Sequence, residues 1–164
     1  MAIRNITGSF TRPADTTAYA SGDLVANSTT AGSVVPVELR AVGAYPQGAS
    51  IVRRAILRKS GTGITNAAFR IHLYRTGTIT CANGDNGAWS TNQVANYLGG
   101  FSVTLDRAFT DGAYGAAIPI VGQEVMIRLA SGQSVWALVE ARGAYTPASA
   151  EVFTIGLDLI DEAS

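Results

Sequence analysis

A chain of 164 residues has the length of one ordinary domain. Hydrophobic residues make up 47% of it and charged residues only 15%, which excludes a disordered chain, since disorder needs much charge and few apolar groups. The 12 basic and 12 acidic residues cancel, so the chain lacks the basic footprint of a nucleic-acid-binding protein.

The expected elements are β-strands along the whole chain, because apolar and polar side chains alternate with a period of two. The weaker candidates come first, at 3–11, 24–26, 34–41 and 51–59. Clearer runs follow at 69–74, 101–106, 124–129, 135–142 and 153–159. Helical spacing is confined to 91–98, which predicts one short turn.

Turn-forming residues separate these runs, such as Asp111-Gly112 and the hairpin expected at 130–133. Each run has one apolar face to bury, which predicts an all-β fold, a two-layer antiparallel β-sandwich. We assign the sandwich to 23–164 as a single domain. Residues 1–22 become rich in Thr, Ser, Gly, Ala and Asp after the first strand candidate, and we expect them to form an extended N-terminal arm.

Few side chains offer catalytic chemistry. His72 is the only histidine and Cys81 the only cysteine, so a disulfide within the chain and a structural zinc site are excluded. Asp85 is the lone carboxylate of the turn at 83–87, too few for an EF-hand calcium site. We therefore expect no enzyme activity, no metal and no cofactor. A β-sandwich hydrolase becomes an alternative only if folding places two carboxylates about 5–10 Å apart in a groove.

Membrane and export signals are also missing from the sequence. No run approaches 18 consecutive apolar residues, and the first residues lack the apolar core of a signal peptide. We expect synthesis in the cytoplasm and no membrane partner.

The N-terminal arm supplies the first candidate contact residues: Arg12, Pro13, Asp15 and Tyr19. An Arg-Pro pair combines a stiff backbone with a forked donor for carboxylates or carbonyls, which suits contact with a partner. The alternative is that Asp15 and Thr16 only form a turn leading into the strand that begins at Leu24.

Trp89 and Tyr97 are the second candidates, in the long segment 80–99. Long loops that carry large aromatic side chains are often functional, and exposed rings can stack on sugars or partners. Anchoring of the loop on the end of the sandwich is the competing interpretation.

Two parts of the chain have distinctive sequences: 10–25, FTRPADTTAYASGDLV, and 135–149, VWALVEARGAYTPAS, which is followed by EVFTI at 151–155. These parts resemble small structural proteins that tailed bacteriophages encode close to their capsid genes. Together the two parts cover about a quarter of the chain. Although distinctive, they contain no motif whose chemistry defines a role.

The resemblance implies a capsid decoration (cement) protein with a jelly-roll-like β-sandwich. Proteins of that type sit on the outside of the virion, bind the major capsid protein lattice and stabilise it, usually as symmetric oligomers. We therefore expect a homo-oligomer, trimer or dimer. Trp136 and Leu138 lie opposite the more apolar set of their strand, and a symmetric copy is expected to cover them, although either face of that strand suits the core.

The alternative function is a carbohydrate- or receptor-binding β-sandwich module of the phage tail or fibre. In that case Trp89 and Tyr97 form a stacking platform for the ligand.

Overall fold

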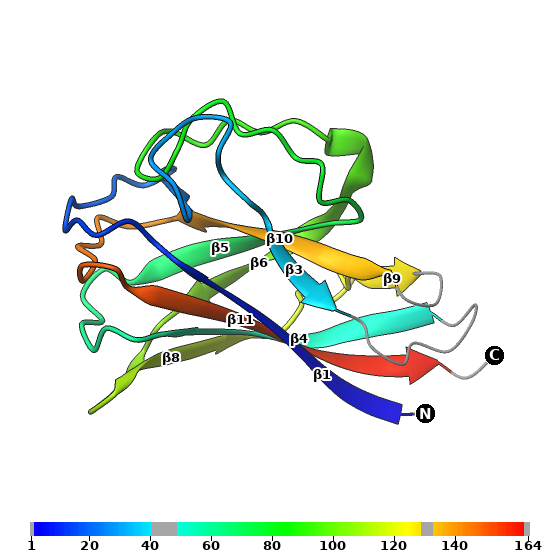
Figure 1. The fold of residues 1–164 in the computed structure, drawn as a ribbon. Helices are drawn as coiled ribbons and strands as arrows, with labels where there is room; N and C mark the ends of the chain where they lie inside the picture. Colours follow the sequence, from blue (N-terminus) through cyan, green and yellow to red (C-terminus); the bar gives the residue numbers. More distant parts are fainter. Residues whose placement is uncertain (1, 41–48, 129–132, 163–164) are drawn as a thin grey trace.

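The computed structural model describes residues 2–40, 49–128 and 133–162. In these residues two antiparallel sheets pack face to face (Figure 1). One sheet has the strand order β1 (Ala2–Thr11), β11 (Val152–Glu162), β4 (Ala49–Lys59), β8 (Gly112–Ala117) and β7 (Arg107–Phe109), with β9 (Met126–Arg128) also paired with β4. The other has the order β2 (Leu24–Val25), β10 (Ser134–Ala141), β5 (Ala68–Tyr74) and β6 (Tyr97–Thr104), with β3 (Val37–Arg40) also paired with β10. The predicted all-β, two-layer antiparallel sandwich is confirmed.

The strand order within each sheet is that of a jelly roll. The main strands in chain order are β1, β3, β4, β5, β6, β8, β10 and β11. If these eight strands are numbered 1 to 8 along the chain, the six-stranded sheet has the order 1-8-3-6. The five-stranded sheet has the order 2-7-4-5. The chain therefore crosses between the layers at most connections, and this is the two-Greek-key path of a jelly roll.

The core between the sheets is built from the alternating apolar side chains. Phe69, Ile71 and Leu73 of β5 point inward, as do Phe153 and Ile155 of β11, and each is at most 1% exposed. Burial of such side chains contributes roughly 1.5–3 kcal/mol each. The sequence pattern of β10 did not decide which of its two faces lies in the core. The structure buries the face formed by Val135, Ala137, Val139 and Ala141.

A second, smaller apolar cluster lies on the outer face of the five-stranded sheet, beneath the long loops seen at the top of Figure 1. Its buried members are Leu24, Ala26, Val34, Tyr74, Ile79, Cys81 and Leu138. Leu138 is therefore covered by loops of its own chain, not by the symmetric copy that we had expected. Trp136 is half-buried beside it, and a Cβ on Gly77 would lie 2.7 Å from Trp136 Cε2, so the backbone at Gly77, in the segment 75–93, passes directly over that ring.

The N-terminal residues differ from the expected arm. β1 pairs with β11 along its whole length, from Ala2 opposite Asp161 to Thr11 opposite Val152. The strand candidate at 3–11 is thus confirmed as part of the sheet. Its side chain Ile6 is buried in the core between the sheets. The residues after β1 cross the end of the sandwich and are held there by buried polar side chains.

The remaining expectations for single elements have different outcomes. The hairpin formed by β7 and β8 was not predicted, because its strands are short and β8 consists mostly of alanine and glycine. Of the run at 124–129, whose last residue lies outside the described ranges, Met126–Arg128 form the short strand β9. The turn expected at 91–98 is present as the 3-10 helix η1 (Val94–Asn96). The hairpin expected at 130–133 falls largely outside the described residues.

Candidate functional site

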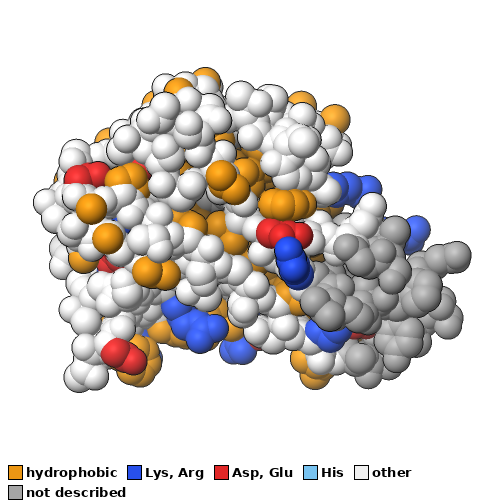
Figure 2. Space-filling view, in the orientation of Figure 1, with side chains coloured by type: hydrophobic (Ala, Val, Ile, Leu, Met, Phe, Trp, Pro, Cys, Tyr) orange, Lys and Arg blue, Asp and Glu red, His pale blue; other side chains and the backbone are white. Residues whose placement is uncertain are grey.

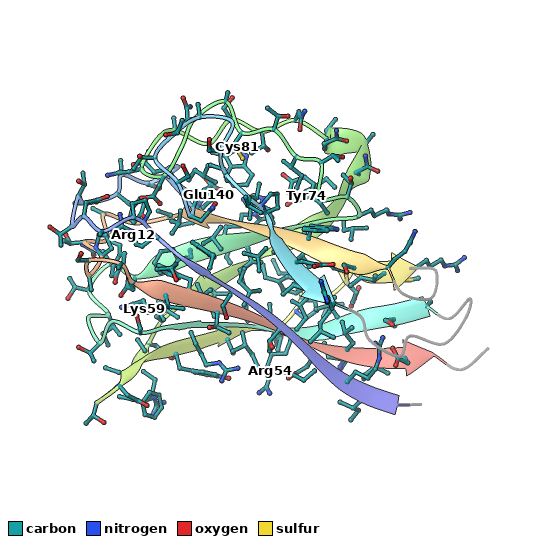
Figure 3. All side chains as sticks on the ribbon, in the orientation of Figure 1. Arg12, Arg54, Lys59, Tyr74, Cys81 and Glu140 are labelled. Carbon is teal, nitrogen blue, oxygen red and sulfur yellow. The ribbon has the colours of Figure 1, made fainter. Side chains whose placement is uncertain are left out.

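A pocket of about 580 Å³ opens on the outer face of the five-stranded sheet. The alternation of β5 places His72 and Tyr74 on this face, because their neighbours Ile71 and Leu73 point into the core. Figure 3 shows Tyr74, Cys81 and Glu140 beneath and among the loops that cover the sheet. The pocket is lined by His72, Tyr74, Trp89, Thr91, Asn92, Gln93, Val94 and Tyr97.

Four rings form the wall of this aromatic pocket. The rings of His72 and Trp89 are stacked, with centroids 4.1 Å apart and planes 26° from parallel. Tyr74 and Tyr97 meet edge to face, with centroids 5.3 Å apart. Trp89 and Tyr97, the two residues singled out in the sequence, therefore lie in one pocket. Both keep exposed surface, since Trp89 is half-buried and Tyr97 is 36% exposed.

A chain of hydrogen bonds fixes the floor of the pocket. Tyr97 OH lies 3.1 Å from His72 Nδ1, and His72 Nε2 lies 2.8 Å from Glu140 Oε2. A carboxylate only accepts, so the Nε2 proton belongs to His72, and Nδ1 accepts from the Tyr97 hydroxyl. Arg142 Nη1 donates to the other oxygen of Glu140 over 3.1 Å. Both ring nitrogens of His72 and both carboxylate oxygens of Glu140 thus have partners, and the rings are held in place.

Burial lowers the pKa of His72 from its ordinary value of 6.5, although the hydrogen bond and charge of Glu140 oppose this shift. The nearby positive charges of Arg70 and Arg142 act in the same direction as burial. His72 is therefore neutral at neutral pH, and the pocket lining carries no formal charge.

This shift predicts a pH dependence of stability. The pKa of His72 is higher in the unfolded chain than in the folded chain. The contribution of His72 to the free energy of unfolding is therefore complete above about pH 6.5, and it is lost as the pH falls through the lower pKa of the folded chain. NMR titration of the ring protons measures the folded pKa directly, because His72 is the only histidine. His72→Gln is the control and should remove this part of the pH dependence of unfolding. A folded pKa above 6.5 would contradict the neutral pocket.

The rim of the pocket carries neutral polar side chains. Asn92 Oδ1 accepts from the Thr80 N–H over 2.9 Å, and Gln93 Oε1 accepts from Asn96 Nδ2 over 2.7 Å. Both residues use their amide oxygens within the chain, which leaves their amide N–H groups for a ligand. Gln93 also has φ 70° and ψ 33°, a left-handed backbone that is uncommon for a residue with a side chain and is often found at functional sites.

Metal and thiol chemistry find no support in the part of the chain that the structure describes. No group of three or more His, Cys, Asp or Glu side chains that could hold a metal ion lies within those ranges. Cys81 is buried, and burial raises the pKa of its thiol, which disfavours the reactive thiolate.

The residues assigned to the arm have a different role from the one expected. Arg12 and Tyr19 are 2% exposed, so they offer almost no surface to a partner. Arg12 Nη2 donates to Asp85 Oδ2 over 2.9 Å and Arg12 Nε donates to Tyr19 OH over 2.8 Å, while Tyr19 OH donates to Asp85 Oδ1 over 2.7 Å. Burial beside Asp85 raises the pKa of Tyr19, which keeps its hydroxyl protonated. This buried cluster ties the segment after β1 to the 75–93 loop.

Pro13 and Asp15 lie at the edge of the same cluster and are half-buried. Asp15 Oδ1 accepts from the Thr17 N–H over 3.0 Å, which is the turn that had been the alternative interpretation of this residue. Asp15 also accepts from Arg12 Nη2 over 3.0 Å.

A second buried ion pair lies at the same end of the sandwich, where Figure 3 places Arg12 and Lys59. Lys59 Nζ donates to Glu151 Oε1 over 3.0 Å, and neither side chain has exposed surface. Tyr145 OH donates to the same carboxylate over 2.8 Å, and the Arg12 N–H donates to the Glu151 carbonyl over 3.1 Å. The two ion pairs therefore join the chain segments that meet at this end.

The comparison with protein-family models finds no match, and no curated protein is similar in sequence. In the residues that the structure describes, no helix is long and apolar enough to cross a membrane.

Proposed function

We propose that this chain is a virion structural protein, a decoration (cement) protein that binds the outside of a bacteriophage capsid lattice and stabilises it. The observation that supports this most directly is a group of exposed aliphatic side chains in the connection from β8 to β9. Ile118, Ile120 and Val121 are 76%, 70% and 93% exposed. Adjacent apolar side chains of this kind are typical of a surface that a partner covers.

The remaining surface fits an assembled protein. Figure 2 shows a face with apolar side chains at several places and few charged ones between them. A jelly roll is also an architecture of viral capsid domains, although the fold alone does not decide the function. The major capsid protein is the partner in this proposal, and the chain acts as a homo-oligomer, trimer or dimer, on the exterior of the virion.

Stabilisation of the capsid follows from mass action in this proposal. A protein that binds the assembled lattice but not its separate subunits lowers the free energy of the assembled state. Several contacts per oligomer add avidity without any new type of interaction. No catalytic group is needed.

Val121→Asp tests the proposed contact surface. We expect it to weaken binding of the protein to preformed capsid shells of its phage by about tenfold or more, because a charge would be buried in an apolar contact. Cosedimentation of protein with shells measures the affinity.

Val94→Asp is a matched control, since Val94 is 88% exposed but lines the aromatic pocket. It should bind shells as the unaltered chain does. Equal binding by Val121→Asp and the unaltered chain would show that the 118–121 surface does not contact the capsid. Absence of the protein from purified virions would contradict the proposed function itself.

A second candidate function is a carbohydrate- or receptor-binding module of the tail or fibre. The observation that favours it is that Trp89 and Tyr97 line one pocket together with two further rings. The copy number of the protein in purified virions separates the two candidates, because a capsid lattice offers far more sites than a tail.

A further inference from the structure

We infer that the aromatic pocket binds an uncharged saccharide, with the apolar face of a sugar ring against the exposed surface of Trp89 and Tyr97. This inference rests on the second candidate function and specifies its ligand class. None of residues 118–121 is among the described residues that line the pocket, so saccharide binding and capsid binding are tested separately.

The size and lining of the pocket suit a small ligand with one apolar face and many hydroxyl groups. Its volume of about 580 Å³ lies within the roughly 300–1,000 Å³ typical of small-molecule sites. Aromatic rings provide a flat apolar surface that matches the C–H face of a pyranose. The rim provides the hydroxyl of Thr91 and the amide groups of Asn92 and Gln93. A sugar hydroxyl both donates and accepts, so it can bond to each of these groups.

Charge selects an uncharged sugar over an acidic one. All eight lining residues are uncharged at neutral pH, His72 included. No arginine or lysine is among the described residues that line the pocket. Outside the lining, Arg142 donates to Glu140 and Arg70 donates to the neutral Ser102 hydroxyl over 3.2 Å. The carboxylate of a sialic or uronic acid would therefore lose water without a cation in the lining to pair with, which is unfavourable.

The pocket is also preorganised, which limits the entropy lost on binding. Trp89 is stacked on His72, and His72 is fixed at both ring nitrogens. The backbone around Trp89 is tied down as well, since the Trp89 N–H donates to the Gly22 carbonyl over 2.7 Å. The Leu24 N–H donates to the Gly87 carbonyl over 2.8 Å. The platform therefore exists before a ligand arrives.

An array of neutral hexose and N-acetylhexosamine oligosaccharides, printed beside sialylated and uronic-acid oligosaccharides, tests the inference with the full chain. We expect binding to neutral members and none to the acidic ones. Trp89→Ala and Tyr97→Ala should each weaken that binding at least tenfold, and circular dichroism should show that both variants keep the β-fold. Because Tyr97 is partly exposed, its variant keeps the test decisive if Trp89→Ala does not fold.

Fluorescence titration with a neutral oligosaccharide from the array assigns the binding to the pocket. The chain has two tryptophans, so Trp136→Phe leaves Trp89 as the only tryptophan reporter and should bind as the unaltered chain does. Val94→Asp should weaken saccharide binding, whereas Val121→Asp should leave it unchanged, the reverse of their effects on capsid binding.

Two results would overturn the inference in different ways. Preference for acidic oligosaccharides with loss on Trp89→Ala would overturn the uncharged ligand but keep a carbohydrate-binding module. Binding to no oligosaccharide, or binding that survives both aromatic variants, would overturn the ligand class together with the second candidate function. Neither result bears on capsid binding, which the shell experiment measures separately.

Discussion

Asp85→Ala is expected to lower the free energy of unfolding by about 3–5 kcal/mol, because it removes the fully buried carboxylate that pairs with the buried guanidinium of Arg12. The same change removes the acceptor of the Tyr19 hydroxyl and of the Ala26 N–H, which donates to Asp85 Oδ1 over 2.8 Å. Urea unfolding at neutral pH, followed by circular dichroism, measures the loss.

Asp15→Ala is the matched control for this prediction, because Asp15 also pairs with Arg12 but its side chain is 36% exposed. An exposed pair of this kind contributes about 1 kcal/mol or less. The two variants should therefore differ severalfold in their effect on unfolding. Equal small losses would show that the buried cluster does not hold the segment after β1 to the 75–93 loop.

Glu151→Ala should have an effect of similar size at the second ion pair. The change leaves the Lys59 ammonium buried without a carboxylate and removes the acceptor of Tyr145 OH, so we expect a loss of about 3–5 kcal/mol in the free energy of unfolding. The double variant Lys59→Met, Glu151→Leu should recover most of that loss, because apolar side chains of similar volume need no partner. Denaturant unfolding of the single and double variants completes the comparison. A double variant as unstable as Glu151→Ala would show that packing around Glu151, and not the unpaired charge, dominates.

The sandwich was predictable because alternation reports burial locally. In β5 and β11 large apolar residues alternate over the whole strand, so one face had to be buried wherever the strand lay in the fold. In β8 the same information is missing. There the side chains are small for a packing reason, since a Cβ on Gly115 would lie 2.2 Å from the Thr104 carbonyl oxygen. A close approach between chain segments left no alternation to detect.

The candidate site was predictable only in part. Trp89 and Tyr97 stood out as large aromatic residues in a long loop, and the alternation placed His72 on the outer face of its strand. The position of Glu140 under His72 depends on the register between β5 and β10, in which Glu140 lies opposite Arg70 and Leu138 lies opposite His72. Single-sequence patterns do not specify such a register.

The burial of the two ion pairs was the feature that the sequence predicted least well. The reason is that the two partners of each pair lie far apart in the sequence. Arg12 and Asp85 are 73 residues apart, and Lys59 and Glu151 are 92 residues apart. Charged residues in a polar, glycine-rich segment normally indicate exposed surface. Nothing near Arg12 in the sequence showed that an aspartate from a distant turn would neutralise it, so an exposed arm was the natural interpretation.

The pairing of β1 with β11 also has a consequence for how the chain folds. Within the described residues, β1 has β11 as its one hydrogen-bonded neighbour, with Ala2 opposite Asp161 far along the sequence. Until the last strand has left the ribosome, β1 has no strand to pair with, and its core residue Ile6 has no completed sheet to pack in. Contacts so distant in sequence cost loop-closure entropy before they stabilise anything, which makes folding slow relative to a helical protein of the same size. The sandwich is therefore completed only after β11 has been synthesised, when β1 and β11 can pair.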